Sequence, residues 1–183
     1  MTNWSLSSHP FLRAAHGPVV LAVLDGMGIG VPDEGNAIWR AKTPILDHLS
    51  QHALQTVLQA HGKSVGLPTD KDMGNSEVGH NALGAGRVFN QGATLVDEAI
   101  HSGRLFQCDA WNHVISHGTV HFIGLLSDGN VHSHQEHLHA MLRAAKKADV
   151  KRARVHILLD GRDVPKCSAL EYVDALERVL TEL

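Results

Sequence analysis

Long apolar runs are missing from this sequence, and cysteine is scarce. The longest wholly apolar run, Val19 to Leu24, has six residues, far fewer than the roughly 20 that a helix needs to span a bilayer. Residues 1–16 also lack the apolar stretch of a secretory signal. The only two cysteines, Cys108 and Cys167, form no C-x-x-C pair. These absences predict a protein of a reducing, cytoplasmic compartment with no membrane-spanning helix.

An excess of charge of one sign is also missing. Lys and Arg (16) nearly balance Asp and Glu (19), the formal net charge is -3, and no long basic run occurs. Nucleic acids and anionic membranes are bound through basic patches, so neither is an expected partner. With 43% hydrophobic residues, the 183 residues suffice for one large or two small domains with a buried core, which excludes a disordered chain. We therefore expect small-molecule partners.

Three apolar runs of strand length each lead into an Asp-Gly step. Continuous apolar runs are typical of strands buried on both faces of a parallel sheet. Ligands of such sheets bind beyond the carboxyl ends of the strands, and this is where the three aspartates fall. A single Asp-Gly step is as well explained by an ordinary turn, but three of them favour a site. The runs and steps are residues 18–24 with Asp25-Gly26, residues 120–126 with Asp128-Gly129, and residues 154–159 with Asp160-Gly161.

Helical periodicity accompanies the second and third runs. Residues 134–148 carry apolar side chains at i, i+3, i+4 and i+7, which predicts a helix with one apolar face. A second helix is expected over residues 168–180, opening with a capping-box spacing from Ser168 to Glu171. A shorter helix should begin at Pro44. Strand, helix and strand form a right-handed βαβ unit, so the fold class is α/β with a parallel sheet, after an irregular extension over residues 1–16.

Residues 74–80, Gly-Asn-Ser-Glu-Val-Gly-His, contain a candidate nucleophile, Ser76. A serine hydroxyl is a weak nucleophile that a base or a metal must activate, and Asp25 is a candidate ligand for such a metal. The simpler interpretation is a helix start at which Asn75 or Ser76 caps free amides. Arg162 and Asp163 follow the third Asp-Gly step, and a guanidinium suits a carboxylate or phosphate. The simpler interpretation there is an exposed salt bridge in a turn.

Histidine is abundant, with 15 residues, and four of them lie within residues 132–139. His134 and His137 are three apart on the expected helix and share a face, which would allow a metal site. The alternative is a solvated helix start at which only His132 faces a ligand.

Four motifs, in this order, closely resemble those of the cofactor-independent phosphoglycerate mutases. They are residues 24–28 (LDGMG), 73–81 (MGNSEVGHN), 126–134 (LSDGNVHSH) and 159–165 (LDGRDVP), and the resemblance extends from about Gly17 to the C-terminus. The family interconverts 3-phosphoglycerate and 2-phosphoglycerate in glycolysis and gluconeogenesis through a phosphoserine intermediate. It uses two divalent metal ions, usually manganese and sometimes magnesium or cobalt, and no 2,3-bisphosphoglycerate. It is usually monomeric, with an alkaline-phosphatase-like phosphatase domain and an inserted phosphotransferase domain.

The resemblance implies roles for five residues. Ser76 would be the nucleophile and also a ligand of one metal ion, and Asp25 would be another ligand. His132, Arg162 and Asp163 would bind the substrate. Residues 17–90 would be the N-terminal part of the phosphatase, metal-binding domain, and residues 91–183 the N-terminal part of the phosphotransferase, substrate-binding domain.

The family is more than twice as long as this chain. Two protein ligands are too few for a pair of metal ions, since each typically takes three or more. We therefore expect an N-terminal portion of a mutase that is inactive alone and that self-associates, is partly disordered or needs its C-terminal part. The alternatives are another phosphotransferase of the alkaline phosphatase type, a non-catalytic phosphoglycerate-binding or interaction module, and a histidine-based metal-storage protein.

Overall fold

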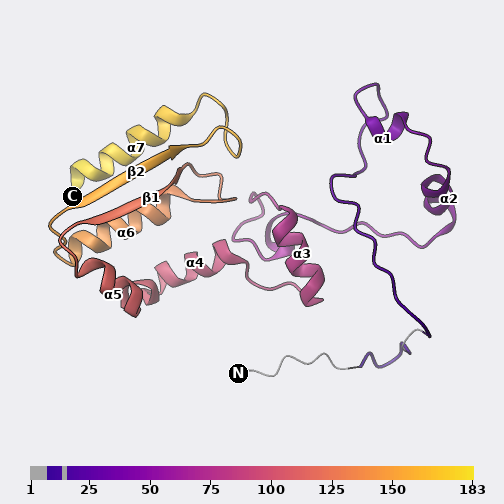
Figure 1. The fold of residues 1–183 in the computed structure, drawn as a ribbon, viewed down its shortest axis with the longest axis horizontal. Coiled ribbons are helices and arrows are strands. Elements are labelled where there is room, and N and C mark those ends of the chain that lie inside the picture. Colours follow the sequence, from indigo (N-terminus) through magenta and orange to yellow (C-terminus); the bar gives the residue numbers. More distant parts are fainter. Residues whose placement is uncertain (1–7, 14–15) are drawn as a thin grey trace. The chain divides into compact units, whose positions relative to one another are not determined.

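The structure is a computed structural model that describes residues 8–13 and 16–183 (Figure 1). Contacts divide the chain into two units, with the boundary between Gln55 and Thr56. The described part of the first unit contains two helices, α1 (Ala37–Arg40) and α2 (Pro44–His52). The start of α2 at Pro44 confirms the predicted helix, because proline at the first position needs no backbone donor. No helix among the described residues is long and apolar enough to cross a membrane.

The strand expected over residues 18–24 does not form, and that prediction was wrong. These residues have no regular secondary structure, and Val19 and Val20 are 81% and 85% exposed. A strand of a parallel sheet needs neighbouring strands for its hydrogen bonds and helices to cover its faces. The described residues of the first unit offer no strand to pair with. The apolar run therefore has no regular secondary structure.

The second unit begins with helices and ends with a βαβα arrangement. Its first half contains a small core of Val65, Leu67 and Val78. Gln91, which is buried, ties this half together because its side-chain amide donates to the Val65 carbonyl at 3.1 Å. The elements are η1 (Gly62–Val65), α3 (Ser76–Ala85), α4 (Gly92–His101), η2 (Arg104–Gln107), α5 (Asp109–Ile115), β1 (Val120–Leu126), α6 (Gln135–Lys147), β2 (Ala153–Leu159) and α7 (Ala169–Glu182).

β1 and β2 pair in parallel, in register from Val120 opposite Ala153 to Leu126 opposite Leu159 (Figure 1). Both strands, the intervening helix α6 and the final helix α7 confirm the sequence predictions within one or two residues, and the α/β class with them. The predicted capping box at Ser168 does not form, so that prediction was wrong. The Ser168 hydroxyl donates to the Pro165 carbonyl at 2.7 Å and makes no cap bond.

Helices α6 and α7 cover the same face of the two strands. Leu126, Leu142 and Leu176, from β1, α6 and α7, form one buried cluster. The opposite face of the strands is open, with Ile123 76% and Leu158 52% exposed. The equal register of the strands brings their carboxyl ends to one edge, where Ser127 and Asp160 follow them.

Candidate functional site

Asp160 organises the edge at which β1 and β2 end. Its carboxylate accepts the Ser127 hydroxyl at 2.7 Å with one oxygen, and the backbone amides of Arg162 and Asp163, both at 3.0 Å, with the other. The residue is 7% exposed and Ser127 is 1% exposed. The bond from Ser127, aided by these amides, lowers the pKa of Asp160 below its ordinary value. The third Asp-Gly step is therefore a fixed turn that holds residues 160–163.

This turn presents Asp163 to His132. The His132 Nδ1 lies 2.8 Å from the Asp163 Oδ2, and the aspartate side chain is only 10% exposed while the imidazole is 62% exposed. Asp163 packs so closely against residue 129 that only glycine fits there, because a Cβ would lie 2.6 Å from the Asp163 Cβ. Two of the predicted substrate residues thus meet across 31 residues of sequence. Arg162, the third, lies in the same turn and is exposed.

Ser76 opens α3 and is exposed. Asn75 is the cap, since its side chain accepts the Val78 amide at 2.9 Å, so the simpler interpretation of this motif holds for Asn75. The backbone that leads into Ser76 packs closely against Ala60 at Gly74, where a Cβ would lie 1.7 Å from the Ala60 carbonyl oxygen. His80 Nδ1 lies 3.2 Å from the Ser76 Oγ and 2.7 Å from the Ser76 carbonyl oxygen. The nucleophile motif is therefore a rigid helix start with an accessible hydroxyl.

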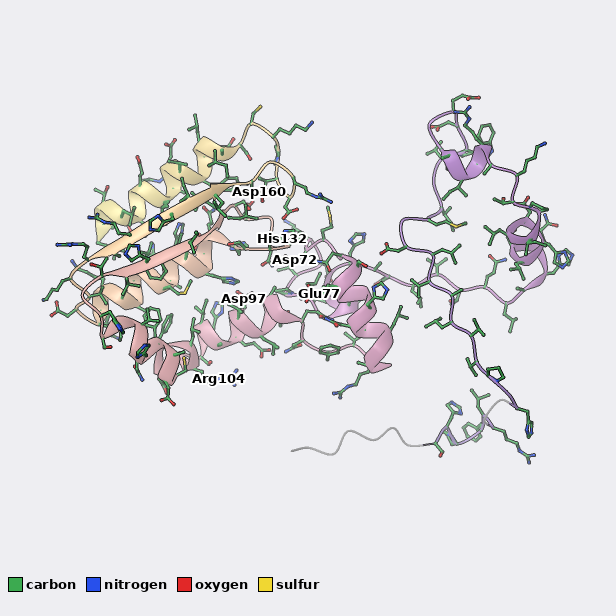
Figure 2. All side chains as sticks on the ribbon, viewed as in Figure 1. Asp72, Glu77, Asp97, Arg104, His132 and Asp160 are labelled. Atoms are coloured by element: carbon green, nitrogen blue, oxygen red, sulfur yellow. The ribbon has the colours of Figure 1, made fainter. Side chains whose placement is uncertain are left out.

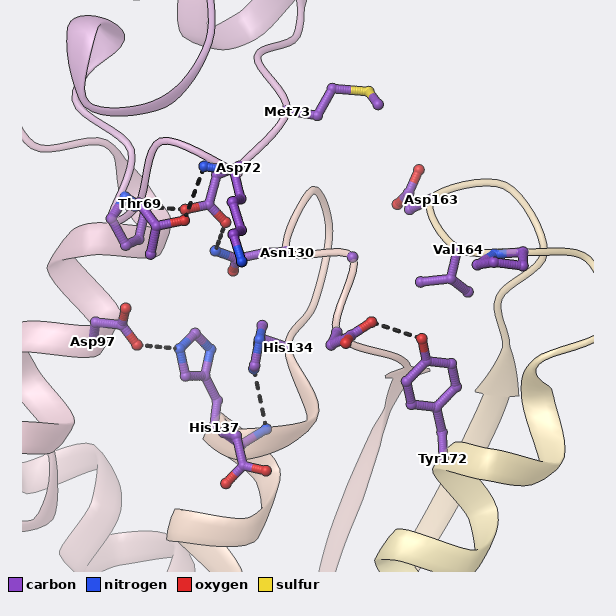
Figure 3. A pocket seen from close by; sticks show the side chains of 16 residues that line it. Thr69, Asp72, Met73, Asp97, Asn130, His134, His137, Asp163, Val164 and Tyr172 are labelled. Atoms are coloured by element: carbon purple, nitrogen blue, oxygen red, sulfur yellow. Dashed lines mark hydrogen bonds and ion pairs between the residues drawn. The ribbon is translucent and has the colours of Figure 1, made fainter.

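The loop before α3 contacts the loop after β1. Asn130 Nδ2 donates to Asp72 Oδ1 at 2.7 Å, and the Thr69 amide donates to Asp72 Oδ2 at 2.6 Å (Figure 3). Partial burial raises the pKa of Asp72, but the hydrogen bonds from Asn130 and Thr69 outweigh it and the pKa lies below its ordinary value. Figure 2 shows Asp72 and His132 in the same region of the unit.

A cleft of about 600 Å³ lies between these loops and the starts of α6 and α7. Across it, His137 Nε2 lies 2.7 Å from Asp97 Oδ1 of α4, and the Tyr172 hydroxyl donates to Asp128 at 2.6 Å (Figure 3). The bond to Asp128 raises the pKa of Tyr172. The charged lining is mainly acidic, so an anion is disfavoured inside the cleft. The charged and histidine residues of the lining are Lys71, Asp72, Asp97, Asp128, His134, Glu136, His137 and Asp163.

The histidines of residues 132–139 bond to neighbouring groups rather than to one another. Besides the His132 and His137 contacts, His139 lies 3.2 Å from Glu136, and His134 accepts the Glu136 amide at 3.2 Å. No group of three or more His, Cys, Asp or Glu side chains suited to a metal ion occurs in the part of the chain that the structure describes. The structure therefore does not assemble the metal site that these histidines would have allowed.

Asp25 lies in the first unit, in an exposed turn after residues 18–24, whereas Ser76 lies in the second. Their joint role as metal ligands stays a prediction. The sequence interpretation assigned no role to Asp72, Asn130 or Asp97. Asn130 carried one signal, since asparagine after glycine tolerates the left-handed backbone conformation that it adopts, with φ of 57°.

Comparison with known proteins gives consistent matches. Residues 96–183 match a family profile described as BPG-independent PGAM N-terminus. The chain is 48% identical to the 2,3-bisphosphoglycerate-independent phosphoglycerate mutase of Zea mays over 99% of this chain and 33% of that protein. It is 51% identical to the 2,3-bisphosphoglycerate-independent phosphoglycerate mutase of Trypanosoma brucei brucei, over 90% of this chain and 31% of that protein.

A solved structure, of Leishmania mexicana phosphoglycerate mutase at low cobalt concentration, matches with a TM-score of 0.77 and 48% identity. The match covers 87% of this chain and 30% of that one. The chain thus spans about a third of the length of the curated relatives it matches.

Proposed function

We propose that this chain supplies the nucleophile and part of the substrate site of a 2,3-bisphosphoglycerate-independent phosphoglycerate mutase, an isomerase. The support is that the chain corresponds to the N-terminal third of such enzymes. The enzyme would interconvert 3-phosphoglycerate and 2-phosphoglycerate through a phosphoserine, in glycolysis and gluconeogenesis in the cytoplasm. Residues 17–90 would belong to the phosphatase domain and residues 91–183 to the phosphotransferase domain. The start of the matching family profile at residue 96 supports this division.

The position of Ser76 carries the proposal. It is exposed in the first turn of α3, a helix of 10 residues whose Val78 amide is capped by Asn75. The remaining amides of a helix start and the helix dipole favour a phosphate on a side chain in the first turn. Capping by Asn75 and the close packing at Gly74 hold the backbone that carries the hydroxyl in place before any phosphate arrives. This rigidity supports Ser76 as the phosphoryl acceptor, because in-line attack needs a positioned oxygen.

His132, Arg162 and Asp163 are proposed to hold the glycerate. Asp163 orients the exposed His132 imidazole through their 2.8 Å bond, and Asp160 fixes the backbone that carries Arg162 and Asp163. A guanidinium can bind a carboxylate or phosphate through two parallel hydrogen bonds. Retention of the glycerate while it reorients is what separates a mutase from a phosphatase.

The residues present do not by themselves fit a pair of divalent metal ions. Asp25 and Ser76 would be two ligands, and the described residues contain no group of three candidate ligands. Each ion typically takes three or more protein ligands, so the rest would come from parts of the relatives that this chain does not match. Manganese, magnesium or cobalt are the proposed ions.

Turnover measurements test the proposal. Residues 1–183 alone, with manganese and 3-phosphoglycerate, are expected to form no 2-phosphoglycerate. Fused in frame to the C-terminal two-thirds of one of the relatives, the same residues are expected to turn over. Arg162→Ala in the fusion should raise KM and lower kcat, whereas Arg178→Ala, at an exposed position of α7, should change neither. A fast isolated chain or a silent fusion would refute the proposal, and phosphoglycerate binding without turnover in the fusion would support a binding module.

A further inference from the structure

One contact connects the proposed nucleophile with the proposed substrate residues. Asp72 lies four residues before Ser76, and Asn130 lies two residues before His132. The 2.7 Å bond between their side chains joins segments 58 residues apart in sequence. It therefore connects the loop that leads into α3 to the loop that presents His132 to Asp163.

Asp72 is held firmly on its own side of the contact. Its carboxylate accepts the Thr69 amide at 2.6 Å, its backbone amide donates to the Thr69 carbonyl at 3.2 Å, and its carbonyl accepts the Gly62 amide at 3.0 Å. The following residues are equally constrained, because Gly74 packs on the Ala60 carbonyl. A displacement of Asp72 is thus transmitted along a short rigid path to Ser76.

Asn130 is held on the other side in an unusual conformation. Its φ of 57° is left-handed, and only one other non-glycine residue among those described, Asp149, has a positive φ. Glycine adopts this conformation most readily, and asparagine tolerates it. Glycine, however, has no side-chain amide to donate. The presence of asparagine is explained by its bond to Asp72, since its backbone position alone would favour glycine.

The side of the cleft at which Asp72 lies does not suit the substrate, which the proposed function places beside Asp163. The cleft lining contains one lysine, two histidines and five carboxylates, among them Asp72. Phosphoglycerate is an anion, and the Asp72 carboxylate, which already accepts the Asn130 amide and the Thr69 amide, repels it. The bond between Asp72 and Asn130 therefore aligns protein segments and does not touch the substrate.

We propose that Asp72 and Asn130 are positioning residues that set the separation between Ser76 and the His132–Asp163 pair, and so the retention of the glycerate while Ser76 carries the phosphate. The effect on retention rests on the proposed function; the alignment of the two loops does not. When the contact is lost, the glycerate escapes and water hydrolyses the phosphoserine. Water forms the new bond to phosphorus, the bond to the Ser76 oxygen breaks, and that oxygen takes a proton from the water.

Variants of Asn130 separate the bond from the backbone conformation. Asn130→Gly keeps the left-handed conformation and removes the donor. Asn130→Asp also tolerates the conformation but sets two carboxylates against each other. Adding Asp72→Asn to Asn130→Asp restores an amide–carboxylate bond with its direction reversed. Asp149→Gly is the matched control, because it places glycine at the other positive φ, in the loop between α6 and β2.

Amide hydrogen exchange of residues 67–75 in the 183-residue chain tests the alignment without any assumption about function. Asn130→Gly should accelerate exchange there about tenfold, as expected for one hydrogen bond to a charged group, and Asn130→Asp should accelerate it at least as much. The exchange rate of the double variant should return to within about threefold of the wild-type rate. The exchange rate of the control, Asp149→Gly, should equal the wild-type rate. Unchanged exchange in Asn130→Gly, or no rescue in the double variant, would overturn the inference.

The fusion described above tests the consequence for catalysis. We expect Asn130→Gly to raise the ratio of inorganic phosphate released to phosphoglycerate isomerised about tenfold, and the double variant to restore it. Altered exchange with an unaltered ratio would overturn the role in retention. If Ser76→Ala left turnover intact, the proposed function would fail, while the exchange result would still decide whether the two residues align the loops.

Discussion

Replacing Asp160 by alanine is expected to destabilise the second unit by about 3 kcal/mol. The carboxylate accepts three donors, namely the Ser127 hydroxyl at 2.7 Å and the amides of Arg162 and Asp163 at 3.0 Å each. Ser127 is 1% exposed, so its hydroxyl would stay buried without its acceptor, at a cost of about 1–3 kcal/mol. The two amides lie in a partly exposed turn where water can replace the carboxylate, so each adds less than about 1 kcal/mol.

Urea unfolding followed by far-ultraviolet circular dichroism measures this loss. With an m value of about 2 kcal/mol/M, the Asp160→Ala midpoint should fall by about 1.5 M. Asp160→Asn keeps an oxygen for the two amides and should lose only about 1 kcal/mol. Asp174→Ala, an exposed carboxylate of α7, is the control and should stay within about 0.5 kcal/mol of wild type. An Asp160→Ala midpoint equal to that of the control would refute the reasoning.

Three further outcomes are expected. The pKa of Asp160 is lower in the folded than in the unfolded chain, mainly through Ser127. Its ionised carboxylate therefore stabilises the fold above about pH 4, and this stabilisation is lost as the pH falls through the folded pKa. Urea midpoints between pH 6 and 3 should fall more steeply for wild type than for Asp160→Asn, and equal slopes would contradict this. Leu126→Ala should cost about 3 kcal/mol by leaving a cavity against Leu142 and Leu176, and a loss below about 1 kcal/mol in the same urea assay would show that the helices do not share this core. The open face of the sheet should make the chain self-associate, and Ile123→Glu should reduce this in sedimentation velocity, whereas a wild-type monomer at every concentration would count against it.

The sequence predicted those elements whose partners lie nearby in the chain. Strands β1 and β2 and the helix between them form one βαβ unit, so apolar runs and helical periodicity were sufficient to find them. The run over residues 18–24 is also apolar and of strand length, yet it forms no strand. A strand depends on neighbours to which it hydrogen-bonds, and composition does not report whether they are present.

The candidate site was predicted in its residue types and only partly in its geometry. The Asp-Gly step at Asp160 marked a turn after a strand, and the parallel register explains why it meets the loop that carries His132. The bond between Asp72 and Asn130 joins residues 58 apart whose spacing follows no local periodicity. Only the three-dimensional arrangement of the loops reveals such a contact, because side-chain pairing between loops has no sequence pattern.

Phosphopeptide mapping tests the central claim, that Ser76 accepts the phosphoryl group, most directly. The fusion of residues 1–183 to the C-terminal two-thirds of a relative would be incubated with 3-phosphoglycerate and manganese, quenched in acid and mapped by mass spectrometry. We expect phosphate on the peptide that contains Ser76, and neither phosphate nor turnover in Ser76→Ala, while Ser102→Ala, at an exposed helix end, behaves as wild type. Full turnover in Ser76→Ala, or phosphate on a different side chain, would contradict the account.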